Sequence, residues 1–65
     1  MEITNTEYHT FRGEILGKVF HFENDTSVSV EINTGEIYDA DGVFEASAEH
    51  IEAIEKAGTK VKTFN

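Results

Sequence analysis

Carboxylates are the most abundant polar side-chain groups in this chain, and six of them fall where a folded domain could present them together. The acidic set comprises Glu31, Glu36, Glu45, Glu49, Glu52 and Glu55. The last three recur at i, i+3 and i+6 in a segment with helical periodicity, so they form a stripe along one helix. Such a surface suits docking on a basic protein, with rapid and salt-sensitive association. An ordinary solvated helix face would carry the same residues, and both interpretations stay open.

The distribution of charge narrows the kind of partner. Thirteen acidic residues against five basic ones give a formal net charge of −8. No Lys or Arg occurs from Val19 to Glu55, and the bases gather near the two ends, at Arg12, Lys18, Lys56, Lys60 and Lys62. Phosphate backbones and anionic lipid would repel such a chain, so we expect no direct nucleic-acid or membrane binding. A protein partner is expected, and a basic one is favoured.

Two features could suggest a metal site. The segment from Asp39 to Glu45 has oxygen ligands around a glycine, as calcium loops do, but it lacks a third ligand before Gly42. An Asp41-Gly42 hairpin turn accounts for the same residues. The histidines, at positions 9, 21 and 50, have no metal-ligand spacing, and the chain has no cysteine. We therefore expect neither a metal nor another cofactor.

The chain also lacks the usual marks of an enzyme. Ser47 has no nucleophile-elbow context, and its place just before a helical period makes it a helix N-cap. There is no glycine-rich phosphate loop. A chain of 65 residues leaves little room for a cleft that excludes water. We expect a protein without catalytic activity.

Strand signals occupy most of the chain. The clearest runs from Ser27 to Asn33, where Val28, Val30 and Ile32 are expected to face the core. The alternating residues, Ser27, Ser29 and Glu31, are expected on a wet face. Further strands are predicted at residues 11–23, 36–39 and 43–45, with turns at 23–26, 33–35 and 41–42. Residues 59–64 are predicted to return along the sheet, and residues 1–10 to form an edge strand or an arm.

Two elements have finer local signals. In the strand predicted at residues 11–23, both faces are partly apolar, which indicates a central strand; Gly13 and Gly17 suit bulges or sites of close backbone approach. Leu16 has the same parity as Phe20 and Phe22, and so the same expected face. The helix is predicted to begin after Ser47 and to end at Gly58, a left-handed C-cap. Its apolar stripe is expected to comprise Ala48, Ile51, Ile54 and Ala57.

Together these signals predict one α+β domain spanning residues 1–65. It is a small antiparallel β-meander of three to five strands, with one short C-terminal α-helix packed on one face. So short a chain builds only a marginal core. A meander also leaves unpaired strand edges. We therefore expect support from self-association or from a larger assembly.

The C-terminal third resembles a known group of proteins. Residues 41–54 and 56–61, DGVFEASAEHIEAI and KAGTKV, are similar to the ending of many short bacteriophage open reading frames. In these, a strand of the pattern glycine–apolar–Phe/Tyr–Glu leads into a short helix capped by Ser or Thr, then a glycine and a closing strand. Several are virion-associated or assembly proteins, so the resemblance implies a structural or assembly role. It transfers no functional residues.

Two functions are therefore predicted. The first is a phage-like structural or assembly component that binds copies of itself or a larger subunit. The alternative is an acidic inhibitor that mimics nucleic acid and blocks a nucleic-acid-binding protein of the host. The N-terminus has neither a basic start nor an apolar run, so we expect no signal peptide and a location in the host cytoplasm or the virion.

Overall fold

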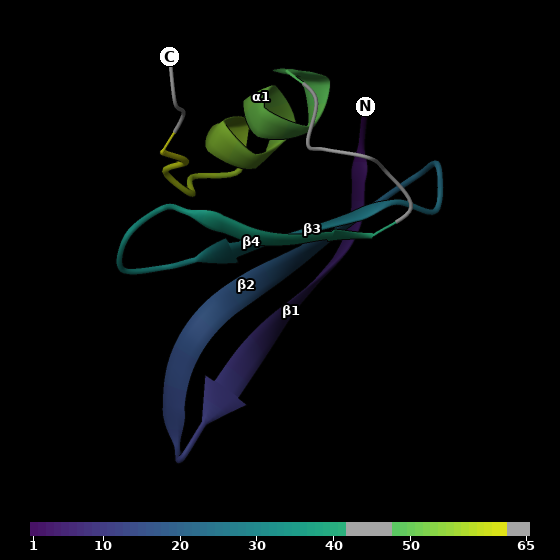
Figure 1. The fold of residues 1–65 in the computed structure, drawn as a ribbon. Helices are drawn as coiled ribbons and strands as arrows, with labels where there is room; N and C mark the ends of the chain where they lie inside the picture. The colour runs from purple at the N-terminus through teal and green to yellow at the C-terminus, as the bar shows by residue number, and fades with distance from the viewer. Residues whose placement is uncertain (42–47, 63–65) are drawn as a thin grey trace.

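A computed structural model describes residues 1–41 and 48–62 of the chain. In these residues four strands form one antiparallel sheet, and a helix follows (Figure 1). The elements are β1 (Ile3–Phe11), β2 (Glu14–Phe22), β3 (Ser27–Glu31), β4 (Ile37–Asp41) and α1 (Ala48–Lys56). The strands lie in sequence order across the sheet. The predicted α+β class, an antiparallel meander with one short C-terminal helix on one face, is confirmed.

A two-residue turn at Arg12 and Gly13 joins β1 to β2. Their φ angles are 51° and 81°. Positive φ at both central residues defines a type I′ turn, whose twist matches that of the flanking strands. The strand predicted over residues 11–23 is confirmed as β2, an inner strand of the sheet, but it begins three residues later than predicted, because Gly13 reverses the chain instead of forming a bulge. The edge strand predicted within residues 1–10 is confirmed as β1.

A β-bulge interrupts β2 close to this turn. His9 lies opposite Gly17 and Thr10 lies opposite Ile15, so Leu16 is an extra residue without a partner in β1. A bulge re-aims the side chain of its extra residue. Leu16 consequently lines a hollow with His9, on the face of the sheet that α1 does not cover. The expectation that it shares the core face of Phe20 and Phe22 is wrong.

The core lies between one face of the sheet and α1. Its buried residues are Phe20, Phe22, Val28, Val30, Ile54 and Val61. Ile3, Ile37, Ile51 and Ala53 pack against them. The strands supply most of these side chains, and the helix and the segment after it cover them. We call the side of the sheet that α1 does not cover the open face.

The strand β3 departs from its predicted pattern at two positions. Ser29, expected to be wet, is only 3% exposed, because β3 is an inner strand and Ser29 lies between Val19 and Asp39 in register. Ile32, expected in the core, is 44% exposed, since β3 ends before it at Glu31. Whether a side chain of this sheet is buried therefore depends on the strands beside it as well as on its own polarity.

The helix presents a different stripe from the predicted one. His50 and Ile54 are buried, and Ile51 and Ala53 are half-buried. Ala48 and Ala57, expected in the stripe, are both exposed. Compared with the prediction, the buried face of the helix is rotated so that His50 and Ala53 replace Ala48 and Ala57.

The end of the helix matches its prediction. Gly58 has φ 97°, and its N–H donates to the carbonyl of Glu55 at 3.0 Å. The N–H of Thr59 donates to the carbonyl of Ile54 at 3.2 Å. Together these bonds form a Schellman motif, in which a left-handed glycine caps the last carbonyls. The predicted left-handed C-cap is confirmed.

The chain after Gly58 returns to the sheet without forming a strand in residues 59–62. Val61 is buried in the core, and the N–H of Lys62 donates to the carbonyl of Gly35 at 2.8 Å. The strand predicted over residues 59–64 is therefore wrong for its described part. The turn predicted at 33–35 is confirmed, and β4 begins one residue later than expected. The predicted strand at 43–45, most of the Asp41-Gly42 turn and the Ser47 cap lie outside the described residues.

Candidate protein-binding surface

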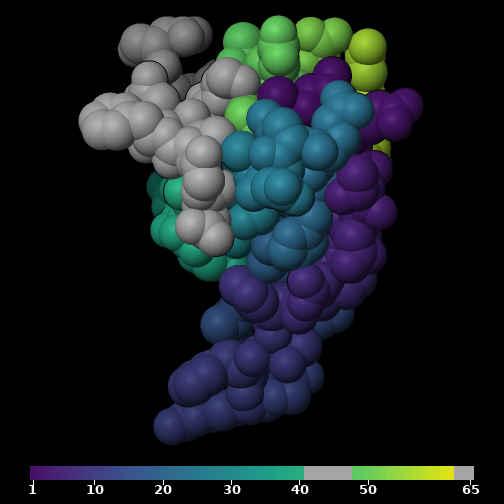
Figure 2. Space-filling view, turned by 90° about the vertical axis from the view of Figure 1, so that its right-hand side faces the viewer, coloured from purple at the N-terminus to yellow at the C-terminus, as the bar shows by residue number. Residues whose placement is uncertain are grey.

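Residues 8–18, which we call the arm, form the end of the β1–β2 hairpin that projects past β3 and β4 (Figure 1). The pairing of β2 with β3 runs only from Gly17 to His21. Beyond Gly17 no strand in the described residues pairs with the hairpin, apart from one bond in which the N–H of Ile32 donates to the carbonyl of Leu16 at 3.2 Å. Figure 2 shows the result as a narrow projection at the end of the molecule away from α1.

The arm exposes several large apolar side chains. Phe11 is 59% exposed, Tyr8 56%, Ile15 50% and Leu16 43%. Scattered apolar residues are normal on a protein surface, whereas several on one projecting element mark an interaction site. Sequence reasoning missed this surface because it assigned residues 11–23 to one central strand with both faces covered. The arm is therefore the leading candidate for partner contact.

The arm also differs from the rest of the molecule in charge. It carries two of the five bases and only one of the thirteen acids. The Arg12 guanidinium carbon lies 5.2 Å from the centre of the Phe11 ring. The Lys18 amine lies 5.4 Å from the centre of the Tyr8 ring and 5.3 Å from that of Phe20. At these distances cation–π attraction keeps the cations over the aromatic rings. The arm therefore presents an apolar and basic surface on an acidic protein.

At the base of the arm, the open face carries a hollow of about 360 Å³ lined by His9, Leu16, Glu31 and Tyr38. Tyr38 is the extra residue of a second bulge, in β4. Its hydroxyl lies 2.6 Å from Nδ1 of His9, a hydrogen bond that joins β4 to β1 across the sheet. The hollow suits a single apolar side chain of a partner, with polar groups at its rim.

Gly17 makes this contact across the sheet feasible. A Cβ at Gly17 would lie 2.8 and 2.9 Å from ring carbons of Tyr38, which is closer than real Cβ contacts. The missing side chain therefore lets the Tyr38 ring cross β2 and reach His9. A close approach does occur at Gly17, but the approaching group is a side chain and not the backbone that was predicted.

The acidic set is divided between different parts of the molecule. Glu31 lines the hollow on the open face, whereas Glu49, Glu52 and Glu55 are exposed on α1, which covers the other face. Glu36 is half-buried beside the β3–β4 turn, with its carboxylate 3.8 Å from the Lys62 amine. Glu45 lies outside the described residues. The stripe predicted on the helix is present, but Glu31 is not part of the same patch.

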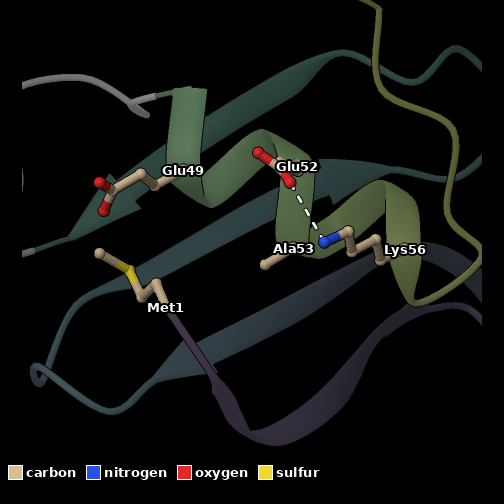
Figure 3. A pocket seen from close by; sticks show the side chains of 5 residues that line it. All are labelled: Met1, Glu49, Glu52, Ala53 and Lys56. Carbon is tan, nitrogen blue, oxygen red and sulfur yellow. Dashed lines mark ion pairs between the residues drawn. The ribbon is translucent and has the colours of Figure 1, made fainter.

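One member of the helical stripe is neutralised locally. The Glu52 carboxylate lies 3.1 Å from the Lys56 amine, one helical turn away. Figure 3 shows this ion pair beside a hollow of about 120 Å³, where the Met1 side chain extends toward Glu49. The remaining stripe residues, Glu49 and Glu55, have no ion pair among the described residues. The negative charge available to a basic partner on α1 is correspondingly smaller than the sequence suggests.

The three histidines make separate contacts. Nε2 of His21 donates to Oε1 of Glu7 at 2.6 Å, and His9 bonds Tyr38. Within residues 1–41 and 48–62, no three His, Asp or Glu side chains are grouped to hold a metal ion. Of the carboxylates in the calcium-like segment, only that of Asp39 belongs to a described side chain.

His50 fastens the first turn of α1 to the β2–β3 turn. The Thr26 hydroxyl donates to Oδ1 of Asn24 at 2.5 Å. It can then accept from Nε2 of His50, which lies 3.0 Å away. The His50 ring meets Phe22 edge-on, with ring centres 4.7 Å apart. His50 is buried, and these contacts indicate a structural role.

Comparison with protein-family models, with curated proteins and with solved structures finds no match to this chain. No relative therefore indicates a function or a set of site residues. In the part of the chain that the structure describes, no helix has the length and apolar character needed to cross a membrane.

Proposed function

We propose that this chain is a non-enzymatic protein-binding module, of the structural or assembly kind, that contacts its partner mainly through the arm. The observation that carries the proposal is the group of apolar side chains on the arm, beyond the reach of the core. Aromatic residues flanked by arginine are typical anchors of protein interfaces. Such a module would act in the host cytoplasm or in the virion, as the predicted phage-like role requires.

The hollow beside the arm extends the proposed contact surface. His9 and Leu16 belong to both, so a partner covering the arm on its open face also reaches Tyr38. Glu31 at the rim could then bond a donor of the partner. This places one member of the acidic set within the proposed contact.

The experiment is a comparative capture from an extract of the source organism. The bait is the wild-type chain, a Phe11→Ser/Ile15→Ser variant of the arm, or a Glu49→Lys/Glu52→Lys/Glu55→Lys variant of the helix. The altered residues are all exposed, so circular dichroism should show the fold intact. We expect a partner that survives high salt, is lost with the arm variant and is retained by the helix variant.

The same experiment tests the alternative function. Glu49 and Glu55 on α1 favour an acidic mimic of nucleic acid, whose partner would be a salt-labile nucleic-acid-binding protein. That partner should be lost with the helix variant and retained by the arm variant. If one partner is retained by both variants, neither proposed surface is the binding surface.

A further inference from the structure

The outer edge of β1 is unpaired in the part of the chain that the structure describes. β1 is the first strand of the sheet, and every residue after Ile3 is exposed. No described segment pairs with this edge. The strand contains neither proline nor lysine, two residues that protect edge strands from pairing with another chain. β1 can therefore accept a further strand.

The backbone groups available on this edge follow from the turn. Phe11 and Glu14 close the two-residue turn and so form a hydrogen-bonded pair. The two kinds of pair alternate along an antiparallel ladder. The extra residue of the bulge, Leu16, belongs to β2, so the alternation continues along β1. The N–H and C=O groups of Thr10, Tyr8 and Thr6 therefore point away from β2. These outward residues are spaced evenly about Tyr8.

The regular part of β1 is symmetric about the same residue. A register shift between Ile3 and Asn5 interrupts the strand at one end, and the turn at Arg12 ends it at the other. Residues 5–11 remain, with Tyr8 at their centre. In an antiparallel pair of copies centred on Tyr8, Thr6 of each copy would lie opposite Thr10 of the other, and the two Tyr8 residues would lie opposite each other. Only this register uses every outward group of the stretch.

The side chains on the open face fit the same register. It places Glu7 of each copy opposite His9 of the other. Within one chain Glu7 uses Oε1 for His21, and His9 uses Nδ1 for Tyr38. When the Tyr38 hydroxyl donates to Nδ1, Nε2 of His9 carries the proton and can donate to the second oxygen of Glu7. The pairing therefore forms two equivalent contacts between Glu7 and His9, one on each side of the two-fold axis.

We propose that two copies of this chain pair antiparallel through β1, with Tyr8 on a two-fold axis, and join their four-stranded sheets into one. The contact is isologous, as in most symmetric dimers. The inference rests on the proposed function in that it names a second copy as one partner of the arm. Ile15 and Leu16, on the far strand of the hairpin, remain open to a different partner.

Single-cysteine variants test the register directly, because the chain has no cysteine of its own. Hydrogen-bonded antiparallel neighbours have Cα atoms about 5.5 Å apart, within the range of a disulfide. Tyr8→Cys should therefore give a covalent dimer under mild oxidation. In Thr10→Cys the two cysteines would be about 14 Å apart along the strands, so we expect cross-linking at least about tenfold slower.

A charge exchange gives a second readout that does not depend on cysteine. His9→Glu places two carboxylates opposite each other at both ends of the contact, and should weaken dimerisation about tenfold. Adding Glu7→Lys restores opposite charges and should recover most of the loss. Sedimentation equilibrium of the wild-type chain and both variants measures the effect.

The outcomes separate this inference from the proposed function. Equal cross-linking of Tyr8→Cys and Thr10→Cys, or a wild-type chain that sediments as a monomer at every concentration, overturns the β1 pairing. If that monomer still captures a partner through the arm, the proposed function stands without the pairing. A dimer that cross-links through Tyr8 but captures no other protein supports the pairing alone.

Discussion

The strand β2 runs through both the arm and the rest of the molecule, which packs around α1 and which we call the body. The two parts bury the side chains of β2 to opposite extents. Toward the body, Phe20 and Phe22 lie in the core between the sheet and α1. Toward the arm, Ile15 and Leu16 are about half exposed. The residues are equally apolar, so polarity does not explain the difference.

The difference comes from what lies against each half of the strand. The body has β3 beside β2 and α1 above it, whereas the arm beyond Gly17 is a two-stranded ribbon. A ribbon alone cannot exclude water from its side chains. The arm therefore contributes little apolar burial to folding, which leaves its surface available for binding. Stability and binding should consequently respond to mutations in different halves of one strand.

The largest expected effect compares two phenylalanines. Phe20→Ala empties a fully buried site, which typically costs about 3–5 kcal/mol of unfolding free energy. For so small a domain that loss should leave the chain largely unfolded. Phe11→Ala on the arm should cost less than about 1 kcal/mol. Urea denaturation followed by circular dichroism measures both, and a similar loss in the two variants would contradict the division into arm and body.

Two glycines with positive φ provide the next comparison. Gly13→Ala in the arm meets nothing within 4 Å, so it should cost only the backbone strain of about 1–2 kcal/mol. A Cβ at Gly35 would lie 2.9 Å from the Lys60 carbonyl oxygen and 3.0 Å from the Lys62 nitrogen. Gly35→Ala should therefore cost about 1–3 kcal/mol more, by displacing the segment that places Val61 in the core. Equal thermal stabilities of the two variants would argue against this packing.

A smaller effect is expected where the arm meets the body. Gly17→Ala should push the Tyr38 ring away and break its bond to His9, at a net cost of about 1 kcal/mol. In a Tyr38→Ala background the same change meets no ring and should cost only a few tenths of a kcal/mol. A double-mutant cycle of unfolding free energies measures the coupling. Additive costs would show that Tyr38 does not cross Gly17 in solution.

The smallest effect is expected on the exposed helix surface. Lys56→Ala removes the ion pair with Glu52, and should change the unfolding free energy by less than about 0.5 kcal/mol. Any loss should shrink further when salt is raised. Thermal unfolding at low and high salt measures it. A loss comparable to that of Gly35→Ala would mean that the helical stripe supports the fold, and so is not simply surface charge.

Local chemistry made much of the fold predictable from the sequence. Gly58 after a helical period predicted the C-cap, and Asn33-Thr34-Gly35 predicted a turn. Both predictions were right because these residues adopt the required backbone angles at low cost in free energy. The alternation around Val28 and Val30 gave β3. The turn at Arg12 and Gly13 was missed, since arginine is not a usual residue at positive φ.

The candidate site was less predictable, because its residues come together only in the folded chain. The helical glutamate stripe could be foreseen from its spacing. The exposure of Phe11 and Leu16 could not, since no periodic pattern reveals where the covering layer ends. The contact between His9 and Tyr38 joins residues of β1 and β4 and depends on two bulges, which leave no clear signal in the sequence.

The sequence by itself determined the meander, the C-cap of its helix and most of its described turns, because backbone preferences and side-chain periodicity act over a few residues. It also determined the excess of carboxylates and their absence from most of residues 8–18. Tertiary structure alone decided that His50 and Ser29 are buried, that the acidic set is divided, and that half of an apolar hairpin stays uncovered. Those outcomes depend on which distant segments pack together, and a helix of nine residues covers only part of the sheet.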